Sequence, residues 1–324
     1  MKVKGNCILC EKQTELTKEH VPPRRLGNTG DKKTRTGNFE DFLKADFTKG
    51  DFPKGIKRKP QGNVHYTLCG ECNSFFGSEY VKEYIKFAED NRNFLYGNIN
   101  AKKGTDSLTY SVKKINPIRV AKEVVAMFFS INGENDSMDK PFLDAVRGYL
   151  SDPKNNFFPH EDYQIIMNYY LPIGLSQDAK TKIPNDIIGD NIPHNVIKSF
   201  MTLDISGGKQ IRFSEIQYDG IGFTLVDLKK STFIIKEGYD LKTFLCADDK
   251  IKEMYLYKIP ILTPMVITMM EMHNGINYPD PGSDLLVRWQ LIVDFLTELK
   301  RFGAIKLNLF QNLKSNQRNH NRDG

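Results

Sequence analysis

Two Cys-X-X-Cys pairs constrain this chain more than any other feature of its sequence. Cys7 and Cys10 form the first pair and Cys69 and Cys72 the second, so four of the five cysteines lie within the first 72 residues. Each pair can offer two sulfurs from one tight turn, and four thiolates match the tetrahedral preference of zinc. In a reducing compartment such pairs indicate a metal and not disulfides. The sequence therefore predicts a structural Zn²⁺, with an iron–sulfur cluster or a redox-active pair as the alternatives.

Length and composition indicate an ordinary globular protein. With 324 residues, 40% hydrophobic and 27% charged, the chain is expected to form one small and one larger domain. No apolar run approaches the length of a membrane span, and the polar start at residues 1–6 does not resemble a signal peptide. We therefore predict a cytoplasmic location and no membrane partner.

Positive charge is concentrated in the part that carries the cysteines. Residues 1–75 contain 15 Lys and Arg against 9 Asp and Glu, whereas residues 76–324 contain 31 of each. The net charge of +6 therefore belongs entirely to the first quarter of the chain. Basic groups that meet phosphates release condensed counterions, so this distribution favours a polyanionic substrate, and a solvated basic loop is the plainer interpretation.

The sequence of the first ninety residues predicts two extended segments followed by a helix. Residues 14–17 are expected to form a turn or a strand, followed by an extended piece at Glu19 and His20 that ends there because the prolines at 22 and 23 interrupt regular structure. A polar insertion over residues 28–62 is interpreted as a DNA-contacting loop. Residues 63–68 predict a second strand that runs into Cys69. Helical spacing begins at about residue 74, which places Asn73 at or just before the N-terminus of the helix.

The remainder of the chain predicts a larger α+β domain. Residues 91–113 are expected to be a connector with a hairpin, and Asn116 with Pro117 opens a helix that Gly133 ends. Further helices are predicted at 140–150 and 284–301, and strands at 165–170, 200–205, 211–216, 222–226 and 233–235. The predicted division is an N-terminal domain at 1–92, a connector at 93–113, an accessory domain at 114–310 and a flexible tail at 311–324.

In combination, the motifs of the first ninety residues resemble the HNH, or ββα-metal, endonuclease family, in its four-cysteine zinc branch. The matching elements are Cys7 and Cys10, Glu19-His20-Val21-Pro22, Asn63, and Cys69 and Cys72 followed directly by Asn73. The resemblance implies an α+β protein in which a zinc-bound ββα-metal domain precedes the larger domain. It also implies hydrolysis of DNA phosphodiester bonds.

The resemblance further implies a role for each matching residue. His20 would be the general base that takes a proton from the attacking water. Glu19 and Asn73 would hold one catalytic Mg²⁺ or Mn²⁺ through oxygen atoms. Asn63 would fix the loop that aims His20. Glu79 is a further ligand candidate, but we interpret it as a surface glutamate. His65 is interpreted as a hydrogen-bonded strand histidine and not as a phosphate contact.

Substrate, partners and biological role stay open at the level of sequence. The resemblance implies bacterial restriction or anti-phage defence by analogy alone, and a homodimer or a defence-system partner protein is compatible with it. The alternatives are a zinc-organised nucleic-acid-binding adaptor without catalysis and an RNA-cleaving enzyme that uses the same site. The residues expected to contact nucleic acid are all basic and follow the motif or precede the second cysteine pair: Arg24, Arg25, Lys32, Lys33, Arg35, Lys57, Arg58 and Lys59.

Overall fold

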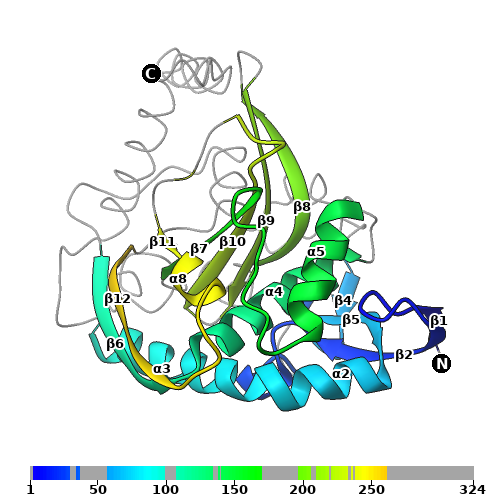
Figure 1. Ribbon diagram of the computed structural model, residues 1–324, viewed down its shortest axis with the longest axis horizontal. Helices are drawn as coiled ribbons and strands as arrows, with labels where there is room; N and C mark the ends of the chain where they lie inside the picture. Colours follow the sequence, from blue (N-terminus) through cyan, green and yellow to red (C-terminus); the bar gives the residue numbers. More distant parts are fainter. Residues whose placement is uncertain are drawn as a thin grey trace, which may run out of the picture.

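A computed structural model of the chain combines helices with antiparallel sheets, compatible with the predicted α+β class (Figure 1). It describes residues 3–29, 34–36, 57–98, 107–133, 138, 140–169, 196–205, 209–218, 220–232, 235 and 238–260. The predicted helix at 284–301 and the predicted tail at 311–324 lie outside these residues.

A three-stranded antiparallel sheet occupies the N-terminal region. Its strands are β1 (Val3–Asn6), β2 (Gln13–His20) and β5 (Val64–Cys69), in the order β1-β2-β5. In the register of β2 and β5, Leu16 lies opposite Cys69 and Glu19 opposite His65, with an irregularity between Thr17 and Glu19. The two predicted strands are therefore confirmed, and their pairing places both predicted functional segments side by side.

One long helical segment follows the second cysteine pair. It consists of α2 (Gly70–Phe76), a π-helical turn (Gly77–Val81) and α3 (Lys82–Asn98). The predicted start near residue 74 is wrong, because Cys69 is the N-cap and Asn73 lies one turn inside the helix. The second cysteine pair is itself the first helical turn, whereas the apolar periodicity that reveals a helix in sequence begins only later.

Two further helices match their predictions. Asn116 caps α4 (Pro117–Gly133), because its side-chain oxygen accepts a hydrogen bond from the Arg119 backbone N–H at 3.4 Å. Nearly every residue of α4 is buried, so it is the central helix of the described fold. The second helix, α5 (Lys140–Ser151), packs against α4. Lys122 is fully buried and donates hydrogen bonds to the carbonyl oxygens of Tyr149 and Asp152 at the C-terminal end of α5, where a cation is favourable.

A five-stranded antiparallel sheet lies on the other side of α4 (Figure 1). Four of the five strands predicted in this half are confirmed, whereas Ile235 at the end of the fifth is not in a strand and Phe233 lies outside the described residues. The sheet has the order β11 (Tyr239–Asp240), β7 (Tyr163–Tyr169), β10 (Ile221–Asp227), β9 (Lys209–Tyr218) and β8 (Val196–Ile205).

The expected connector at residues 91–113 is mostly regular structure. Residues 93–98 continue α3, and the described residues from 107 belong to β6 (Ser107–Ile115). The expected hairpin is wrong for β6, which pairs instead with β12 (Lys252–Pro260), more than 130 residues further along the chain. Such a distant partner leaves no local turn signal in the sequence.

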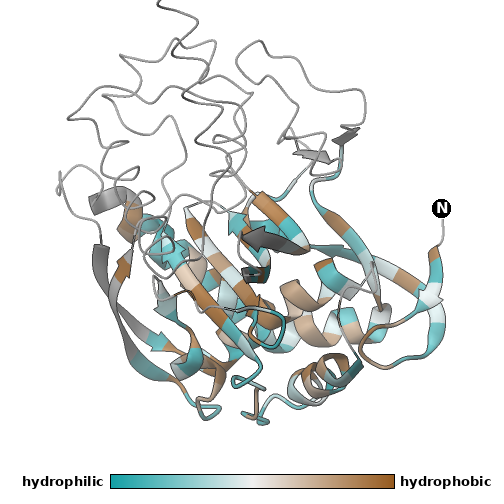
Figure 2. Ribbon diagram, turned by 90° about the horizontal axis from the view of Figure 1, so that it is seen from above, coloured by the Kyte–Doolittle hydropathy of each residue, from teal (hydrophilic) through white to brown (hydrophobic). Residues whose placement is uncertain are grey.

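Buried residues from both halves of the chain form one continuous hydrophobic core. The cluster runs from Cys7 and Leu68 through Phe128 on α4 to Phe223 in the five-stranded sheet. Figure 2 shows the apolar residues concentrated on the central helices and strands. The N-terminal sheet and the five-stranded sheet both pack against α4, which brings Ser130 of that helix into contact with Glu19.

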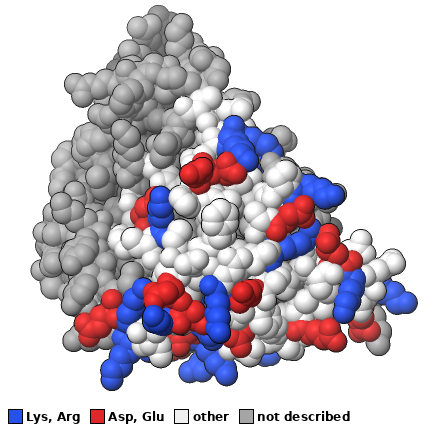
Figure 3. All heavy atoms as spheres, in the orientation of Figure 1, with Lys and Arg blue, Asp and Glu red and all other residues white. Residues whose placement is uncertain are grey.

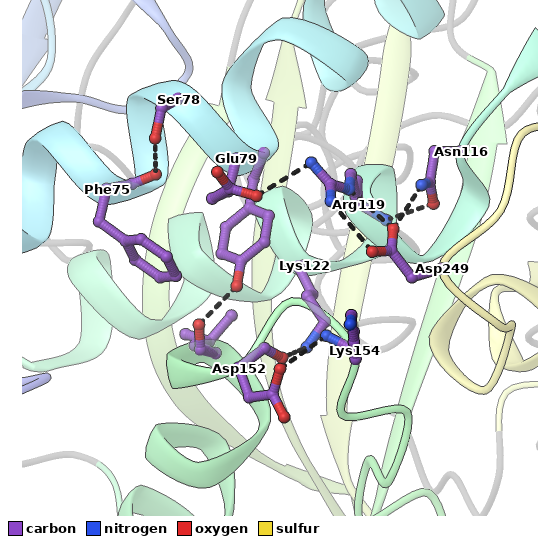
Figure 4. Close-up of polar contacts among 11 residues, drawn as sticks. Phe75, Ser78, Glu79, Asn116, Arg119, Lys122, Asp152, Lys154 and Asp249 are labelled. Atoms are coloured by element: carbon purple, nitrogen blue, oxygen red, sulfur yellow. Dashed lines mark hydrogen bonds and ion pairs between the residues drawn. The ribbon is translucent and has the colours of Figure 1, made fainter.

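An ion-pair network joins the long helical segment to α4 at the rim of this core (Figure 4). Arg119 contacts Asp249 through Nε at 2.8 Å and Glu79 through Nη1 at 3.0 Å, and Asn116 donates to Asp249 at 2.5 Å. Arg119 also reaches the second oxygen of Asp249 at 3.0 Å, the fork geometry that suits arginine. Glu79, weighed above as a ligand, therefore belongs to this network.

Candidate functional site

The four paired cysteines gather into one potential metal site. The sulfurs of Cys7, Cys10, Cys69 and Cys72 all lie within 4.8 Å of one another, and those of Cys10 and Cys69 are 3.8 Å apart. A tetrahedral Zn²⁺ with bonds of about 2.3 Å to sulfur places its ligands about 3.8 Å from each other. The donor set and its spacing therefore fit structural zinc.

Local backbone geometry favours a thiolate at Cys7. Burial alone would raise the pKa of the Cys7 thiol, but backbone N–H groups of Cys10, Cys69 and Leu9 stabilise the thiolate and lower that pKa to about 7. Burial and the neighbouring sulfurs raise the pKa of the Cys72 thiol. Four ionised sulfurs at this spacing would need a cation, which a bound zinc ion would supply.

The first cysteine pair is tied to the rest of the fold. The Ile8 backbone N–H donates to the carbonyl of Thr67 on β5 at 2.9 Å, and Arg147 on α5 donates to the carbonyl of Ile8 at 2.7 Å. Arg147 also pairs with Glu11 at 3.0 Å. The metal site is therefore anchored to β5 and to α5 at once.

Glu19 lies at the end of β2, where it meets α4. Its Oε2 accepts a hydrogen bond from the Thr67 hydroxyl at 3.1 Å and a shorter one, 2.6 Å, from the hydroxyl of Ser130. Ser130 is a fully buried serine in an apolar stretch of α4, and it is separated from Glu19 by 111 positions. The sequence analysis missed this contact; a single serine in an apolar helix is the one local signal that could have suggested it.

Asn73 faces the same strand from the first turn of α2. Its side-chain nitrogen donates to the Lys18 carbonyl and to the Thr17 hydroxyl, each at 3.1 Å. Because both hydrogen bonds use Nδ2, the carboxamide oxygen is the atom that could bind a hard cation. Thr17 and Lys18 directly precede Glu19 on β2, so Asn73 is hydrogen-bonded to the part of the strand next to Glu19.

His20 is the last residue of β2 and is partly buried. Burial and the positive charges of Arg24 and Lys18 lower the pKa of its imidazole, and a hydrogen bond with the backbone of Gln61 acts in the opposite direction. The ring is therefore neutral at physiological pH. A ring N–H that donates to a backbone carbonyl fixes the tautomer and leaves the other nitrogen as a base.

Hydrogen bonds of Asn63 and Asn28 hold the segment that carries His20 in place. Asn63 donates to the Val21 carbonyl at 3.0 Å, and its amide nitrogen lies 2.9 Å from Nε2 of the buried His65. Asn28, which the sequence analysis missed, donates to the carbonyl oxygens of Pro22 and Asn63 at 2.8 and 3.0 Å and accepts from the Asn63 N–H at 2.8 Å. The turn after His20 is thereby fastened to the start of β5.

Gly62 is expected to be essential to the hydrogen bonds between Asn28 and Asn63. Its φ is +78°, and a Cβ built there would lie 2.4 Å from Oδ1 of Asn28. Gly62→Ala should lower the free energy of unfolding by about 2 kcal/mol or more, because a left-handed alanine costs about 1–2 kcal/mol before any collision. Denaturant melts measure the change. The matched control is Gly77→Ala, where the helix is right-handed and a Cβ meets nothing within 4 Å; equal effects of the two changes would contradict this role for Gly62.

The structure describes some of the residues predicted to contact nucleic acid and not others. Arg24 and Arg25 are exposed on a short 3₁₀ turn (Arg24–Leu26), where Arg25 lies 3.8 Å from Glu89. The base of the polar insertion is a two-stranded ribbon of β3 (Thr34–Thr36) and β4 (Lys57–Lys59), in which Arg35 is opposite Arg58. The ribbon thus contains four of the predicted basic residues and ends four positions before Asn63. Lys32 and Lys33 lie outside the described residues.

Charge on the visible face of Figure 3 is mixed. Lys and Arg alternate with Asp and Glu along its lower edge, without a patch of one sign. This agrees with the equal numbers of basic and acidic residues after position 75. The net positive charge of the protein therefore comes from the first quarter of the chain.

Comparison of the chain with models of protein families, with curated proteins and with solved structures finds no match. No helix among the described residues is long and apolar enough to cross a bilayer.

Proposed function

We propose that this protein is a metal-dependent endonuclease whose N-terminal region is a ββα-metal domain organised by a structural zinc. The observation that carries the proposal is that Glu19 and His20 end β2, while the Asn73 side chain, directly after Cys72 of the four-cysteine cluster, donates to Thr17 and Lys18 of the same strand. Carboxylate and carboxamide oxygens suit one Mg²⁺ or Mn²⁺. The thiolates suit zinc, so the ligand atoms of the two sites favour different metal ions.

The chain's own residues would divide the reaction as follows. The Glu19 carboxylate and the Asn73 oxygen would hold a divalent cation, which would supply positive charge to stabilise the scissile phosphate and the departing 3′ oxygen. The neutral imidazole of His20 takes a proton from a water molecule, and the water oxygen attacks phosphorus as the bond to the 3′ oxygen breaks. Asn63 and Asn28 hold the segment that aims the imidazole.

DNA is the proposed substrate, with RNA as the alternative. The basic ribbon of β3 and β4 and the exposed Arg24 and Arg25 support a polyanion, since each phosphate contact releases counterions. A cytoplasmic role in defence, a homodimer and a partner protein stay proposals that follow from the resemblance alone.

A cleavage assay tests the proposed function. Zinc-loaded protein is incubated with supercoiled plasmid, and in parallel with a structured RNA, in Mg²⁺ or Mn²⁺ and with EDTA as a control. We expect nicked and linear DNA with either metal and none with EDTA. Cleavage of RNA alone would reassign the substrate. Salt-dependent DNA binding without any cleavage would contradict the enzyme and favour the adaptor.

The pH dependence of cleavage should report the environment of His20. Its pKa is lowered, so the base stays unprotonated at mildly acidic pH, and kcat should fall only below the ordinary histidine range. Arg24→Ala removes a positive charge near the imidazole, so the pKa should rise and the acidic limb should move to higher pH. A kcat–pH profile of both proteins measures the shift, and a limb that moves to lower pH would contradict the assignment.

A further inference from the structure

Glu123 is an unusual residue for the middle of an apolar helix. Its side chain lies on α4 with only 4% of the residue exposed, and its buried Oε2 has no hydrogen-bond partner among the described residues. Buried polar atoms are normally paired, because a carboxyl group taken out of water without compensation is costly. The position therefore calls for a partner that the described part of the chain does not supply.

The electrostatic neighbour of Glu123 is Glu19. Burial raises the pKa of Glu123, and the negative charge of Glu19 raises it further. Ser130 lies seven positions, two helical turns, after Glu123, so both side chains project from the same face of α4. Since the Ser130 hydroxyl touches the Glu19 carboxylate at 2.6 Å, that face is directed toward the end of β2.

Neither of the two nearby cationic side chains on α4 neutralises the carboxyl group of Glu123. Lys122 is adjacent in sequence, but its ammonium donates to the carbonyl oxygens of Tyr149 and Asp152 at the end of α5. Arg119 shares the face of Glu123, but its guanidinium is engaged with Asp249 and Glu79 (Figure 4). A buried carboxyl group at Glu123 near the partly buried carboxyl group of Glu19 is a ligand pattern that suits a hard divalent cation.

We propose that Glu123 is a third oxygen ligand of the catalytic cation, together with Glu19 and Asn73, so that α4 completes the site. This inference rests on the proposed function and assigns the cation a ligand from the C-terminal side of the predicted domain boundary. Ser130 is then a positioning residue, which holds Glu19 in place through its hydroxyl.

Metal affinity of the zinc-loaded protein tests the proposal without relying on cleavage. Isothermal titration with Mg²⁺ and with Mn²⁺ would compare the wild type with Glu123→Gln, Glu19→Gln and the control Glu161→Gln, an exposed glutamate on the loop before β7. We expect Glu123→Gln and Glu19→Gln each to weaken binding at least tenfold, as expected for loss of a ligand. Their zinc content should stay at one per chain, and the control should bind as the wild type does.

The outcomes separate the two proposals. Unchanged affinity in Glu123→Gln with lost affinity in Glu19→Gln would overturn the role of Glu123 and leave the proposed function standing. Unchanged affinity in both variants would overturn the cation site and the proposed function together. If Glu123→Gln does not fold, crystals of the wild type soaked in Mn²⁺ decide the question. An anomalous peak bonded to the Glu123 carboxylate supports the proposal, and a peak on Glu19 without Glu123 refutes it.

Discussion

Replacing His20 by alanine should reduce cleavage of supercoiled DNA by about 10² to 10⁴-fold, the usual contribution of a positioned general base. The imidazole lies at the end of β2 with a lowered pKa and a hydrogen bond to the backbone of Gln61, so it is neutral and oriented before substrate arrives. Removing it should lower kcat much more than substrate affinity. Initial rates of nicking at saturating DNA measure the loss.

The control for this variant is His160→Ala. His160 lies on the loop between α5 and β7, where its Nδ1 is 3.1 Å from the Phe158 carbonyl, far along the chain from the proposed site. We expect its rate to equal that of the wild type. Equal nicking by His20→Ala and the wild type would contradict the base assignment. A selective loss of kcat in His65→Ala would transfer the role to His65, which the structure instead pairs with Asn63 at 2.9 Å.

Cys69→Ser should abolish zinc binding and with it most of the stability of the N-terminal region. Cys69 ends β5 and is also the N-cap of α2, so its sulfur joins sheet, helix and metal at one residue. Structural zinc contributes about 10–16 kcal/mol of apparent binding free energy in small zinc domains, more than the whole stability of a typical domain. Metal analysis and the yield of soluble, cooperatively unfolding protein measure the effect.

Cys246→Ser is the matched control, because Cys246 is only partly buried and lies outside the four-cysteine cluster. It should keep about one zinc per chain and a melting temperature within a few degrees of the wild type, as the cost of a partly buried thiol is small. A soluble Cys69→Ser protein with unchanged melting would argue against structural zinc. An absorbance spectrum typical of iron and sulfide in the purified wild type would favour the cluster alternative.

Local signals in the sequence were sufficient for most individual elements. Proline after asparagine at 116–117 marks the start of α4, and the alternating residues before Cys69 mark β5. The start of α2 was misjudged, because Gly70-Glu71-Cys72 carries no apolar periodicity. The partner of β6 was also missed, since pairing with β12 depends on contacts between distant segments.

The candidate site, too, could be predicted only in part from local sequence signals. The motif residues Glu19, His20 and Asn73 were identified from the resemblance to the HNH family, and in the structure Asn73 is hydrogen-bonded to the strand that ends with Glu19 and His20. Their partners come from elsewhere: Asn28 from the turn after the motif, and Ser130 and Glu123 from a helix more than 100 residues away. No pattern of spacing connects a serine in an apolar helix with a carboxylate on a strand.

By itself, the sequence determined the chemistry at the N-terminal end: four thiolates in two pairs, an acid followed by a base, an amide after the last cysteine and an excess of positive charge. These features are local, and the metal preference of each group follows from its own atoms. Only the tertiary structure decided that α4 lies against the site. Burial of that helix between two sheets is a property of the whole core, and it is this packing that places Ser130 on Glu19 and leaves Glu123 enclosed beside it.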